Sequence, residues 1–196
     1  MYLFGASGHG KVIKDILEAN NIAVTAFVDD NMNINNCSGL PVLHDASNLS
    51  PIIVGVGVNK IRKKIVERIL ANNENVVFPA VIHPSAIVSP SAKIGEGTVV
   101  MPGAIINADA IIGKHCIVNT GASIDHECVI GDYCHIAPHA TLCGQVKVGD
   151  GTIVGVCACA IPCVTIGEWA TIGAGAAVVR DVDNGVTAVG VPAKSM

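Results

Sequence analysis

A branched aliphatic residue occupies nearly every sixth position of the chain from residue 82 to residue 178, without an insertion or deletion. Sixteen of these seventeen positions hold Ile, Val or Leu, and Ala, Cys, Thr or Val follows each of them four positions later. A fixed period this strict is typical of a solenoid, in which each repeat buries its apolar face against neighbouring repeats. The pattern therefore predicts a repeated unit of strand and turn.

Each six-residue repeat has room for one short strand and one turn. Alternate side chains of a strand share a face, so the aliphatic residue and the small residue two positions before the next one both point inward. Three such sides close a coil of 18 residues, and successive coils stack about 4.8 Å apart. Residues 82–182 then form between five and six coils, a prism roughly 25 Å long.

The first third of the chain has a different pattern, in which short apolar runs alternate with stretches of helical periodicity. Strands are predicted at residues 2–4, 24–30 and 52–58, and helices at residues 11–21 and 59–73. Alternation of this kind predicts a small parallel sheet with helices packed against it.

The second predicted helix is amphipathic. Ile61, Ile65 and Ile69 recur at helical spacing and are expected to face inward, with the Lys and Arg side chains facing solvent. The change of period divides the chain into a Rossmann-like α/β domain over residues 1–78 and an all-β domain over residues 79–196.

The composition agrees with a core of small side chains. Hydrophobic residues make up 51% of the 196, aromatic residues only 3%, and there are 21 glycines. A regular lattice of aliphatic side chains accounts for this combination better than a core built around large rings. A formal net charge of −4 with only 12 Lys and Arg gives no basic surface for nucleic acid or an anionic membrane.

The sequence has no feature of a membrane or secreted protein. No window approaches 18 uninterrupted apolar residues, and the first ten residues lack the basic and long apolar regions of a secretory leader. We therefore expect a cytoplasmic protein. Its eight cysteines are expected to be reduced, because most of them replace the Ala or Val of neighbouring repeats.

The polar residues of ASIDHECVIGDYCHIAPHATLCG, residues 122–144, can be placed on this lattice. His126 lies two positions after the inward Ile124, at a corner of the prism, whereas His135 precedes the inward Ile136 and faces outward from a flat side. The two histidines are half a coil apart. On one chain they occupy different parts of the perimeter, and they meet only if a site forms between two subunits.

The repeats also carry a family resemblance. The segments IGEGTVV, IGKHCIV, IGDYCHI and IGEWATIGAGAAV, followed by GVPAK, resemble those of the hexapeptide-repeat acyltransferases. That resemblance implies a left-handed parallel β-helix that assembles as a homotrimer. With GASGHGK and VDD in the first domain, the whole chain is similar to the narrower group of nucleotide-sugar amine N-acetyltransferases and sialic acid O-acetyltransferases.

Acetyl transfer from acetyl-CoA to an amine needs a base and a hydrogen-bond donor. The base removes a proton, because an ammonium has no lone pair to attack the thioester, and the donor stabilises charge on the carbonyl oxygen. Histidine suits the first role near neutrality, and an adjacent carboxylate fixes its tautomer. Asp125, His126 and Glu127 supply that pairing. The resemblance makes the same assignment, with His126 as the catalytic base and Glu127 as the acid that increases its basicity.

The resemblance also assigns the cofactor side of the site. His135, Val156 and Ala174 match positions that contact acetyl-CoA, and small outward residues leave room for its pantetheine arm. His115 and His139 also lie in turns, and we expect both side chains to be solvated there. Asp125 is an alternative partner for turn amides.

Histidines and cysteines together raise the alternative of a zinc site. A catalytic zinc needs three converging protein ligands, and some β-helix carbonic anhydrases assemble them across a subunit interface. The sulfurs of Cys116, Cys128 and Cys134 are expected to face the core, and the cysteine cluster at residues 157–163 is split between two turn positions. We predict no metal.

Three strand ends of the first domain indicate a ligand site. GASGHGK follows a strand and opens a helix, so its backbone amides suit a phosphate, although its spacing is G-x-x-G-x-G rather than the dinucleotide pattern. VDD and GVGVN end the next two strands, and the carboxyl ends of parallel strands meet at one edge. The resemblance matches six residues to positions that hold the nucleotide sugar: Ser7, Gly8, His9, Asp29, Asp30 and Gly57.

We therefore predict a homotrimer that transfers acetyl from acetyl-CoA to the amine of a nucleotide-linked amino sugar, of the UDP-4-amino-4,6-dideoxy type, in bacterial surface-glycan or glycoprotein sugar biosynthesis. His126 would deprotonate the amine and His135 would position the thioester, without a covalent acetyl-enzyme. O-acetylation of sialic acid or a related sugar is the alternative within the fold. A zinc-dependent carbonic anhydrase-like enzyme and a non-catalytic sugar-nucleotide-binding scaffold are alternatives of other classes.

Overall fold

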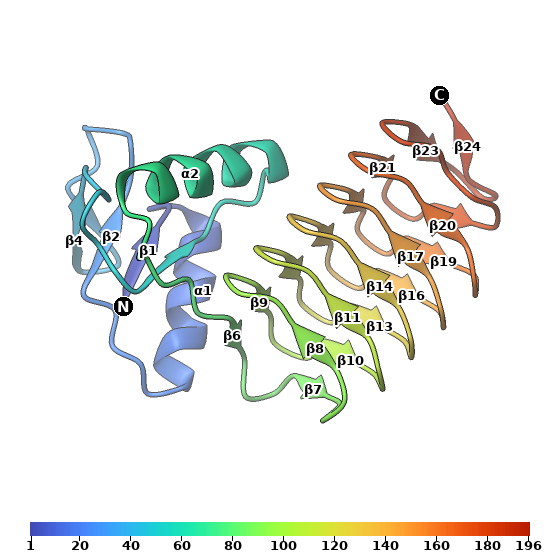
Figure 1. The fold of residues 1–196 in the computed structure, drawn as a ribbon, viewed down its shortest axis with the longest axis horizontal. Helices are drawn as coiled ribbons and strands as arrows, with labels where there is room; N and C mark the ends of the chain where they lie inside the picture. The colour runs from blue at the N-terminus through green and yellow to red at the C-terminus, as the bar shows by residue number, and fades with distance from the viewer.

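The computed structural model describes residues 1–196. An α/β region, blue to teal-green, packs beside a stack of short β coils, green to red, and the chain ends at the far end of that stack (Figure 1). Neither helix has the length and apolarity needed to span a bilayer.

The α/β region is built on a five-stranded sheet with the strand order β3-β4-β2-β1-β5. Its elements are β1 (Tyr2–Phe4), α1 (Gly8–Ala19), β2 (Ala26–Val28), β3 (Asn36–Cys37), β4 (Leu40–Leu43), β5 (Ile52–Val54) and α2 (Asn59–Asn72). All neighbouring strands are parallel except β3 and β4. Alternate strand residues pack against α1 on one face and α2 on the other, so both faces are buried. The predicted small parallel sheet is confirmed.

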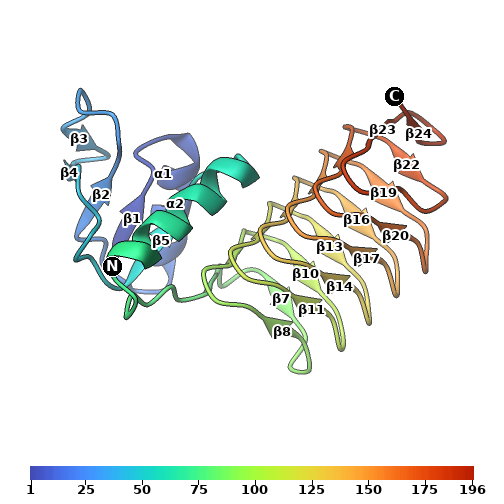
Figure 2. The same ribbon diagram turned by 45° about the horizontal axis from the view of Figure 1, so that its top comes forward.

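From β6 onward the chain forms a parallel β-helix with one two-residue strand every six residues (Figures 1 and 2). These strands are β6 (Val81–Ile82), β7 (Ile87–Val88), β8 (Lys93–Ile94), β9 (Val99–Val100), β10 (Ile105–Ile106), β11 (Ile111–Ile112), β12 (Ile117–Val118), β13 (Ser123–Ile124), β14 (Val129–Ile130), β15 (His135–Ile136), β16 (Thr141–Leu142), β17 (Lys147–Val148), β18 (Ile153–Val154), β19 (Cys159–Ala160), β20 (Thr165–Ile166), β21 (Thr171–Ile172) and β22 (Ala177–Val178). The chain closes with β23 (Thr187–Val189) and β24 (Lys194–Ser195). Paired strands are 18 residues apart, as where Ile117 lies beside His135, which confirms the predicted coil length.

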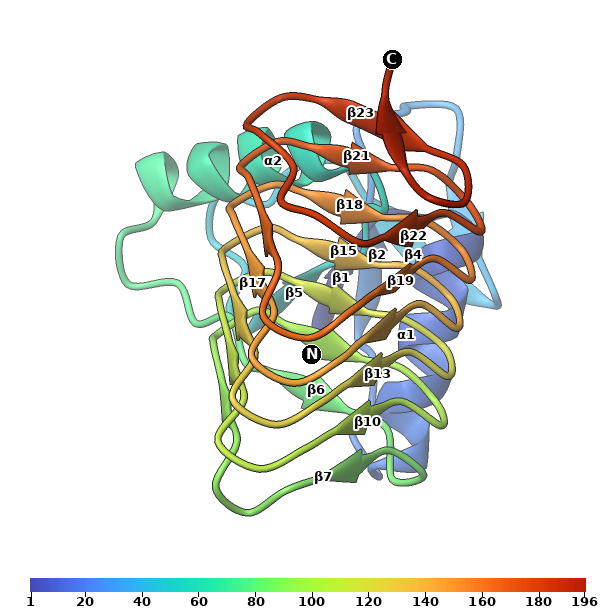
Figure 3. The ribbon, with the colours of Figure 1, turned by 90° about the vertical axis from the view of Figure 1, so that its right-hand side faces the viewer.

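The coils have three sides, which Figure 3 shows from the C-terminal end of the stack. We name each side by one strand: the β15 side runs from β6 to β24, the β13 side from β7 to β22, and the β14 side from β8 to β20. One core of 27 buried residues fills the interior. Cys116, Cys128 and Cys134 belong to that core with at most 1% exposure, so their predicted inward orientation is confirmed.

The α/β region docks on the β15 side of the prism. The outward residues Val81, Val99 and Ile117 stack in one column of that side, and all three belong to the same buried cluster as Leu17 of α1. His135 is the next residue of the column. The proposed boundary between the two domains, at residues 78 and 79, lies in the connection between α2 and β6.

Arg62 of α2 ties the two regions together. Its side chain is 1% exposed and donates hydrogen bonds to both regions. The acceptors within 2.9 Å are the carbonyls of Val56, His115 and Tyr133 and the side-chain oxygen of Asn59. Burial lowers the pKa of Arg62 to about 10, so the guanidinium stays charged at neutral pH. A buried cation satisfied by carbonyls holds α2 at a fixed distance from the coil turns.

The orientation expected for α2 is wrong at one position. Ile61 is 50% exposed, whereas Arg62 faces inward. Ile65 and Ile69 are buried as expected. The helix packs against a corner of the prism as well as against the sheet, and the turn carbonyls at that corner require a donor rather than an apolar side chain.

The expectation that His115 is solvated is also wrong. Its side chain is 3% exposed, with the ring centroid 4.9 Å from that of Phe78 and 5.3 Å from that of Tyr133. The α/β region covers this corner of the prism, and the repeat pattern contains no information about that cover. His139, at a corner that the α/β region leaves open, is exposed as expected.

Replacing Arg62 with Met should lower the free energy of unfolding by about 3 kcal/mol or more, because several buried carbonyls lose a charged donor. Lys64→Met, an exposed position on the same helix, should change it by less than about 0.5 kcal/mol. Urea unfolding measures both values. Equal stability of the two variants would contradict the role assigned to Arg62.

Candidate active site

His126 and Glu127 form the turn between the β13 side and the β14 side. His126 Nδ1 lies 3.1 Å from Glu127 Oε2. An ionised carboxylate only accepts hydrogen bonds, so this contact places the imidazole hydrogen on Nδ1 and leaves a lone pair on Nε2. Both side chains are 54% exposed, and the lone pair is therefore open to a ligand.

Neighbouring coils hold both acids that flank His126. Gln145 Nε2 donates to Glu127 Oε2 at 3.0 Å, and Asn107 Nδ2 donates to Asp125 Oδ1 at 2.9 Å. Hydrogen bonds from Gln145 and then from His126 lower the pKa of Glu127. The Asn107 amide and then the His126 backbone N–H lower the pKa of Asp125. Asp125 thus accepts a hydrogen bond from a turn amide, which is the alternative role considered for it, whereas Glu127 accepts one from the imidazole.

His135 lies on β15 beneath the α/β region. Asn119 Oδ1 accepts from the Thr120 N–H at 2.8 Å, so its Nδ2 must donate to His135 Nε2, at 2.9 Å. This arrangement places the imidazole hydrogen on Nδ1, which is buried beside the Gly57 backbone and makes no hydrogen bond of good geometry. Burial, followed by the charge of Arg62, lowers the pKa of His135 to about 4. The ring is a neutral donor at physiological pH.

His9, on the first turn of α1, lies near His135. Burial and then the charge of Arg62 lower its pKa to about 4, and its Nε2 also lacks a partner. Arg62 donates to the Gly57 carbonyl at 3.2 Å, which places the loop after β5 at the same point. The structure therefore brings His9, Gly57 and His135 together. A buried nitrogen that lacks a hydrogen bond costs free energy. A polar ligand that supplies the missing hydrogen bonds is therefore suited to this point.

The structure separates His126 from His135 on one chain. His135 faces outward from the β15 side, whereas His126 occupies the corner between the other two sides, opposite the β15 side. The core of the prism lies between them. The two imidazoles meet only if they come from different subunits.

Val156 and Ala174 stack at the corner between the β15 side and the β13 side. Both residues are exposed, and the Gly175 N–H donates to the Val156 carbonyl at 2.8 Å. The strand that carries His135 leads into this same corner one coil earlier. Val156 and Ala174 therefore lie along one edge of the prism, and His135 lies on the flat side that leads into that edge.

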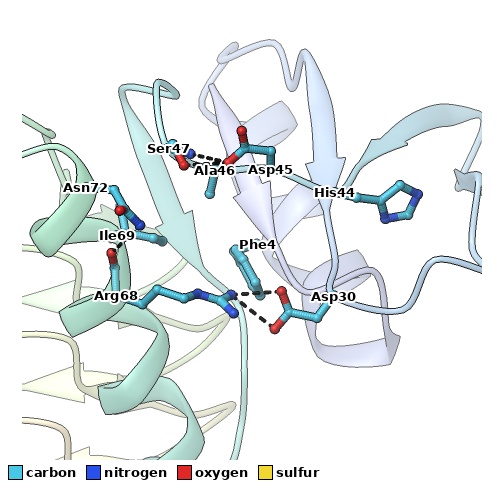
Figure 4. Close-up of a pocket in the computed structure, with 9 residues that line it drawn as sticks. All are labelled: Phe4, Asp30, His44, Asp45, Ala46, Ser47, Arg68, Ile69 and Asn72. Atoms are coloured by element: carbon cyan, nitrogen blue, oxygen red, sulfur yellow. Dashed lines mark hydrogen bonds and ion pairs between the residues drawn. The ribbon is translucent and has the colours of Figure 1, made fainter.

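Asp29 and Asp30 follow β2 but face different partners. Asp29 accepts from the backbone N–H groups of Ala6 and Asn31 at 2.8 and 2.9 Å, so its carboxylate braces the glycine turn. Asp30 accepts from Arg68 at 2.8 and 3.0 Å, and Figure 4 shows the guanidinium facing both carboxylate oxygens.

Asp30 and Arg68 line a cavity of about 210 Å³ between the sheet edge and α2. Its other lining residues are Phe4, His44, Asp45, Ala46, Ser47, Ile69 and Asn72 (Figure 4). Most of the lining is polar, with both donors and acceptors. The cavity is suited to a ring that carries several hydrogen-bonding groups.

Ser7 and Gly8 lie where the glycine turn enters α1. Both are exposed, and the Ser7 side chain makes no capping hydrogen bond. A Cβ added at Gly8 or at Gly57 would meet no atom within 4 Å. The rim predicted to hold the substrate is therefore open to solvent at these positions.

Within one chain, no three His, Cys, Asp or Glu side chains gather closely enough to hold a metal ion. Cys157, Cys159 and Cys163 are exposed and unpaired by disulfides.

Sequence reasoning missed three residues that shape the site: Arg62, Asn119 and Gln145. Gln145 lies one coil after Glu127, so a search at 18-residue spacing would have found it. No comparable signal marks Arg62, because its partners lie 53 to 72 residues away in the β-helix.

Two family models match the chain. The PglD N-terminal domain matches residues 1–69, and the bacterial transferase hexapeptide (six repeats) matches residues 91–126 and 109–144. Among curated proteins, the UDP-N-acetylbacillosamine N-acetyltransferase of Bacillus subtilis (strain 168) is 44% identical over 107 residues, half of this chain and 49% of its own length. The match thus spans about half the length of that relative.

Solved structures match over the whole chain. A histidine-to-asparagine mutant of perosamine N-acetyltransferase from Caulobacter crescentus, in complex with CoA and GDP-perosamine, is 40% identical with a TM-score of 0.95, covering 100% of this chain and 95% of that one. The acetyltransferase domain of PglB from Neisseria gonorrhoeae FA1090 is 38% identical with a TM-score of 0.93, covering 100% and 98%. These matches confirm the fold class, an α/β region followed by a left-handed parallel β-helix.

Acidification from pH 6.5 toward pH 4 should destabilise the protein. His9, His115 and His135 have pKa values of about 4 in the folded state, below the ordinary value, so in this window the unfolded chain binds protons that the folded chain does not. Each group contributes stability that is complete above pH 6.5 and declines by at most about 1.4 kcal/mol per pH unit below it. Urea unfolding at several pH values measures the slope.

The variant His135→Gln should reduce that slope, and His139→Gln, at an exposed turn, should leave it unchanged. Stability that rises on acidification would contradict the burial of these imidazoles.

Proposed function

The chain belongs to the hexapeptide-repeat acetyltransferases that act on nucleotide-linked amino sugars, and from that premise we propose that it transfers the acetyl group of acetyl-CoA to the amine of such a sugar. The finer expectation, a UDP-4-amino-4,6-dideoxy sugar of bacterial surface-glycan or glycoprotein biosynthesis, belongs to this proposal. Relatives that support it are the GDP-perosamine and UDP-N-acetylbacillosamine enzymes.

The main observation in support of the proposal is the contact between the His126 imidazole and the Glu127 carboxylate. The exposed imidazole directs Nε2 away from the carboxylate, as a general base for an incoming amine requires. The ionised Glu127 stabilises the imidazolium that forms when Nε2 takes a proton.

The transfer is proposed to be direct. His126 Nε2 accepts a proton from the sugar amine as the nitrogen attacks the thioester carbonyl carbon. The new C–N bond forms, the C–S bond breaks, and the CoA sulfur leaves as a thiolate that takes up a proton. No acetyl group is bonded to the protein at any stage.

His135 is proposed to donate its Nδ1 hydrogen to the thioester carbonyl oxygen, where negative charge develops. Asn119 supports this role because it holds the tautomer with hydrogen on Nδ1. The low pKa of His135 keeps the ring neutral, so it donates at neutral pH without carrying a charge into the buried site.

The two domains are proposed to bind different substrates, acetyl-CoA in one and the nucleotide sugar in the other. In residues 79–196, Val156 and Ala174 would border the pantetheine groove. In residues 1–78, the glycine turn with Ser7, Gly8 and His9 would hold the phosphates and sugar, and the cavity beside Asp30 would receive the nucleotide end.

The site is proposed to form between subunits of a homotrimer. His126 and His135 lie on opposite parts of one prism, so a joint site needs His126 of one subunit and His135 of another. Exposed aliphatic residues flank the His126 corner, including Ile111 and Val129 at 43% and 41% exposure, and a neighbouring copy would bury them.

Replacing His126 with Ala should reduce acetyl transfer by about 100-fold or more, because the amine loses its base, while binding of acetyl-CoA is retained. Thiol release is measured with acetyl-CoA against UDP-, GDP- and dTDP-linked amino sugars and against free sialic acid. Unchanged turnover would contradict the role of His126 as the base.

The same assay separates the alternative functions. Thiol release with sialic acid alone would favour O-acetylation, and release that depends on stoichiometric zinc would favour the zinc enzyme. No release with any of these sugars would favour a binding scaffold.

Mixing two inactive variants tests the intersubunit site. Trimers reassembled from equal amounts of His126→Ala and His135→Ala chains should recover about a quarter of the wild-type activity, since one interface in four then carries both histidines. The variants alone, treated in the same way, are the control. Absence of recovery in verified mixed trimers would contradict a site that combines His126 of one subunit with His135 of another.

A further inference from the structure

The corner that carries His126 continues through three further coils as a column of turn residues. Asp109, Glu127, Gln145 and Cys163 occupy the same turn position at 18-residue spacing, with φ of 58°, 58°, 63° and 66°. Each turn is joined to the next by a backbone hydrogen bond, including Gln145 N–H to the His126 carbonyl at 2.9 Å. The turn one coil after His126 and Glu127 consists of Gly144 and Gln145.

Gln145 holds the carboxylate that contacts the imidazole. Its Nε2 donates to Glu127 Oε2 at 3.0 Å, and that same oxygen lies 3.1 Å from His126 Nδ1. The Cys163 thiol donates to Gln145 Oε1 at 3.3 Å, which directs the amide nitrogen toward Glu127. One amide therefore fixes which carboxylate oxygen the imidazole meets.

Gly144 makes room for the imidazole itself. A Cβ added at Gly144 would lie 2.5 Å from His126 Cε1 and 2.6 Å from His126 Nε2, closer than real Cβ contacts. The ring therefore lies directly over the backbone of the next coil. Gly144 is absent from the residues with left-handed backbone, so alanine fits its backbone and would displace only the ring.

We propose that Gly144 and Gln145 are positioning residues for the transfer, in which Gly144 seats the His126 imidazole and Gln145 orients the Glu127 carboxylate against it. This inference rests on the proposed role of His126 as the base. Gln145 acts on geometry rather than on ionisation: its hydrogen bond lowers the pKa of Glu127, and without it that pKa returns toward its ordinary value, so the carboxylate stays ionised at neutral pH.

The first experiment compares Gln145→Leu with Asp109→Leu. Leucine removes the amide from Gln145 at similar size, and Asp109 offers the same turn position and backbone conformation one coil before Glu127 without a side-chain hydrogen bond to it. Gln145→Leu should lower kcat about tenfold, with little change in the KM for acetyl-CoA, because the base is misplaced rather than lost. Asp109→Leu should stay within about twofold of the wild type.

A double-mutant cycle shows whether Gln145 acts through Glu127. In a Glu127→Gln background, adding Gln145→Leu should cost less than about twofold further, because the carboxylate that Gln145 positions is already absent. Two full and independent losses would overturn the proposal, as would Gln145→Leu turnover equal to that of Asp109→Leu.

Nitrogen-15 NMR of the His126 ring gives a readout besides activity. The wild type should show the tautomer with hydrogen on Nδ1, and Gln145→Leu should show both tautomers. An unchanged tautomer population would overturn the role of Gln145.

The variant Gly144→Ala tests whether Gly144 leaves room for the His126 imidazole. It should lower kcat about tenfold or more while the melting temperature stays the same or rises, because alanine reduces the entropy of the unfolded chain. Unchanged kcat would overturn the role of Gly144. If His126→Ala keeps full activity, the proposed function fails; if only the Gly144 and Gln145 variants keep it, only this inference fails.

Discussion

The 18-residue register of the β-helix is the constraint on which the rest of the structure depends. Each coil places its turn residues directly over those of the coil before, with the aliphatic core fixing the spacing. Hydrogen bonds between side chains of neighbouring coils therefore run along columns. Asn107 reaches Asp125 and Gln145 reaches Glu127 in this way. The repeat is thus both the scaffold and the device that aligns the polar groups around His126.

Arg62 connects this rigid column to the α/β region. A buried cation usually pairs with a carboxylate, because removing a charge from water is costly. Here, backbone carbonyls from the loop after β5 and from two coil turns, with Asn59, take that role. Such a network has little freedom to slide, since each carbonyl must keep its donor. The Gly57 loop and His135 are therefore held at a fixed separation.

Burial, and after it the charge of Arg62, sets His135 apart from the exposed His126. His126 lies in solvent beside the Glu127 carboxylate, whose own pKa is lowered by hydrogen bonds from Gln145 and then from His126. His135 is buried near Arg62, and both burial and that charge disfavour protonation. The proposed base and the proposed hydrogen-bond donor therefore lie in different environments of the same chain. Their tautomers are also set by different partners, Glu127 and Asn119.

The sequence alone determined the architecture and the positions of several polar residues on it, because both depend on periodicity. The six-residue repeat placed His126 at a corner, His135 on a flat side and the sulfur of Cys134 in the core, since inward and outward positions alternate along each strand. The tertiary structure alone decided what covers each outward position. It buried His115, turned Arg62 inward in place of Ile61, and put His9 beside His135. These outcomes depend on how the α/β region packs against one side of the prism, and contacts between segments so distant in the chain leave no period in the sequence.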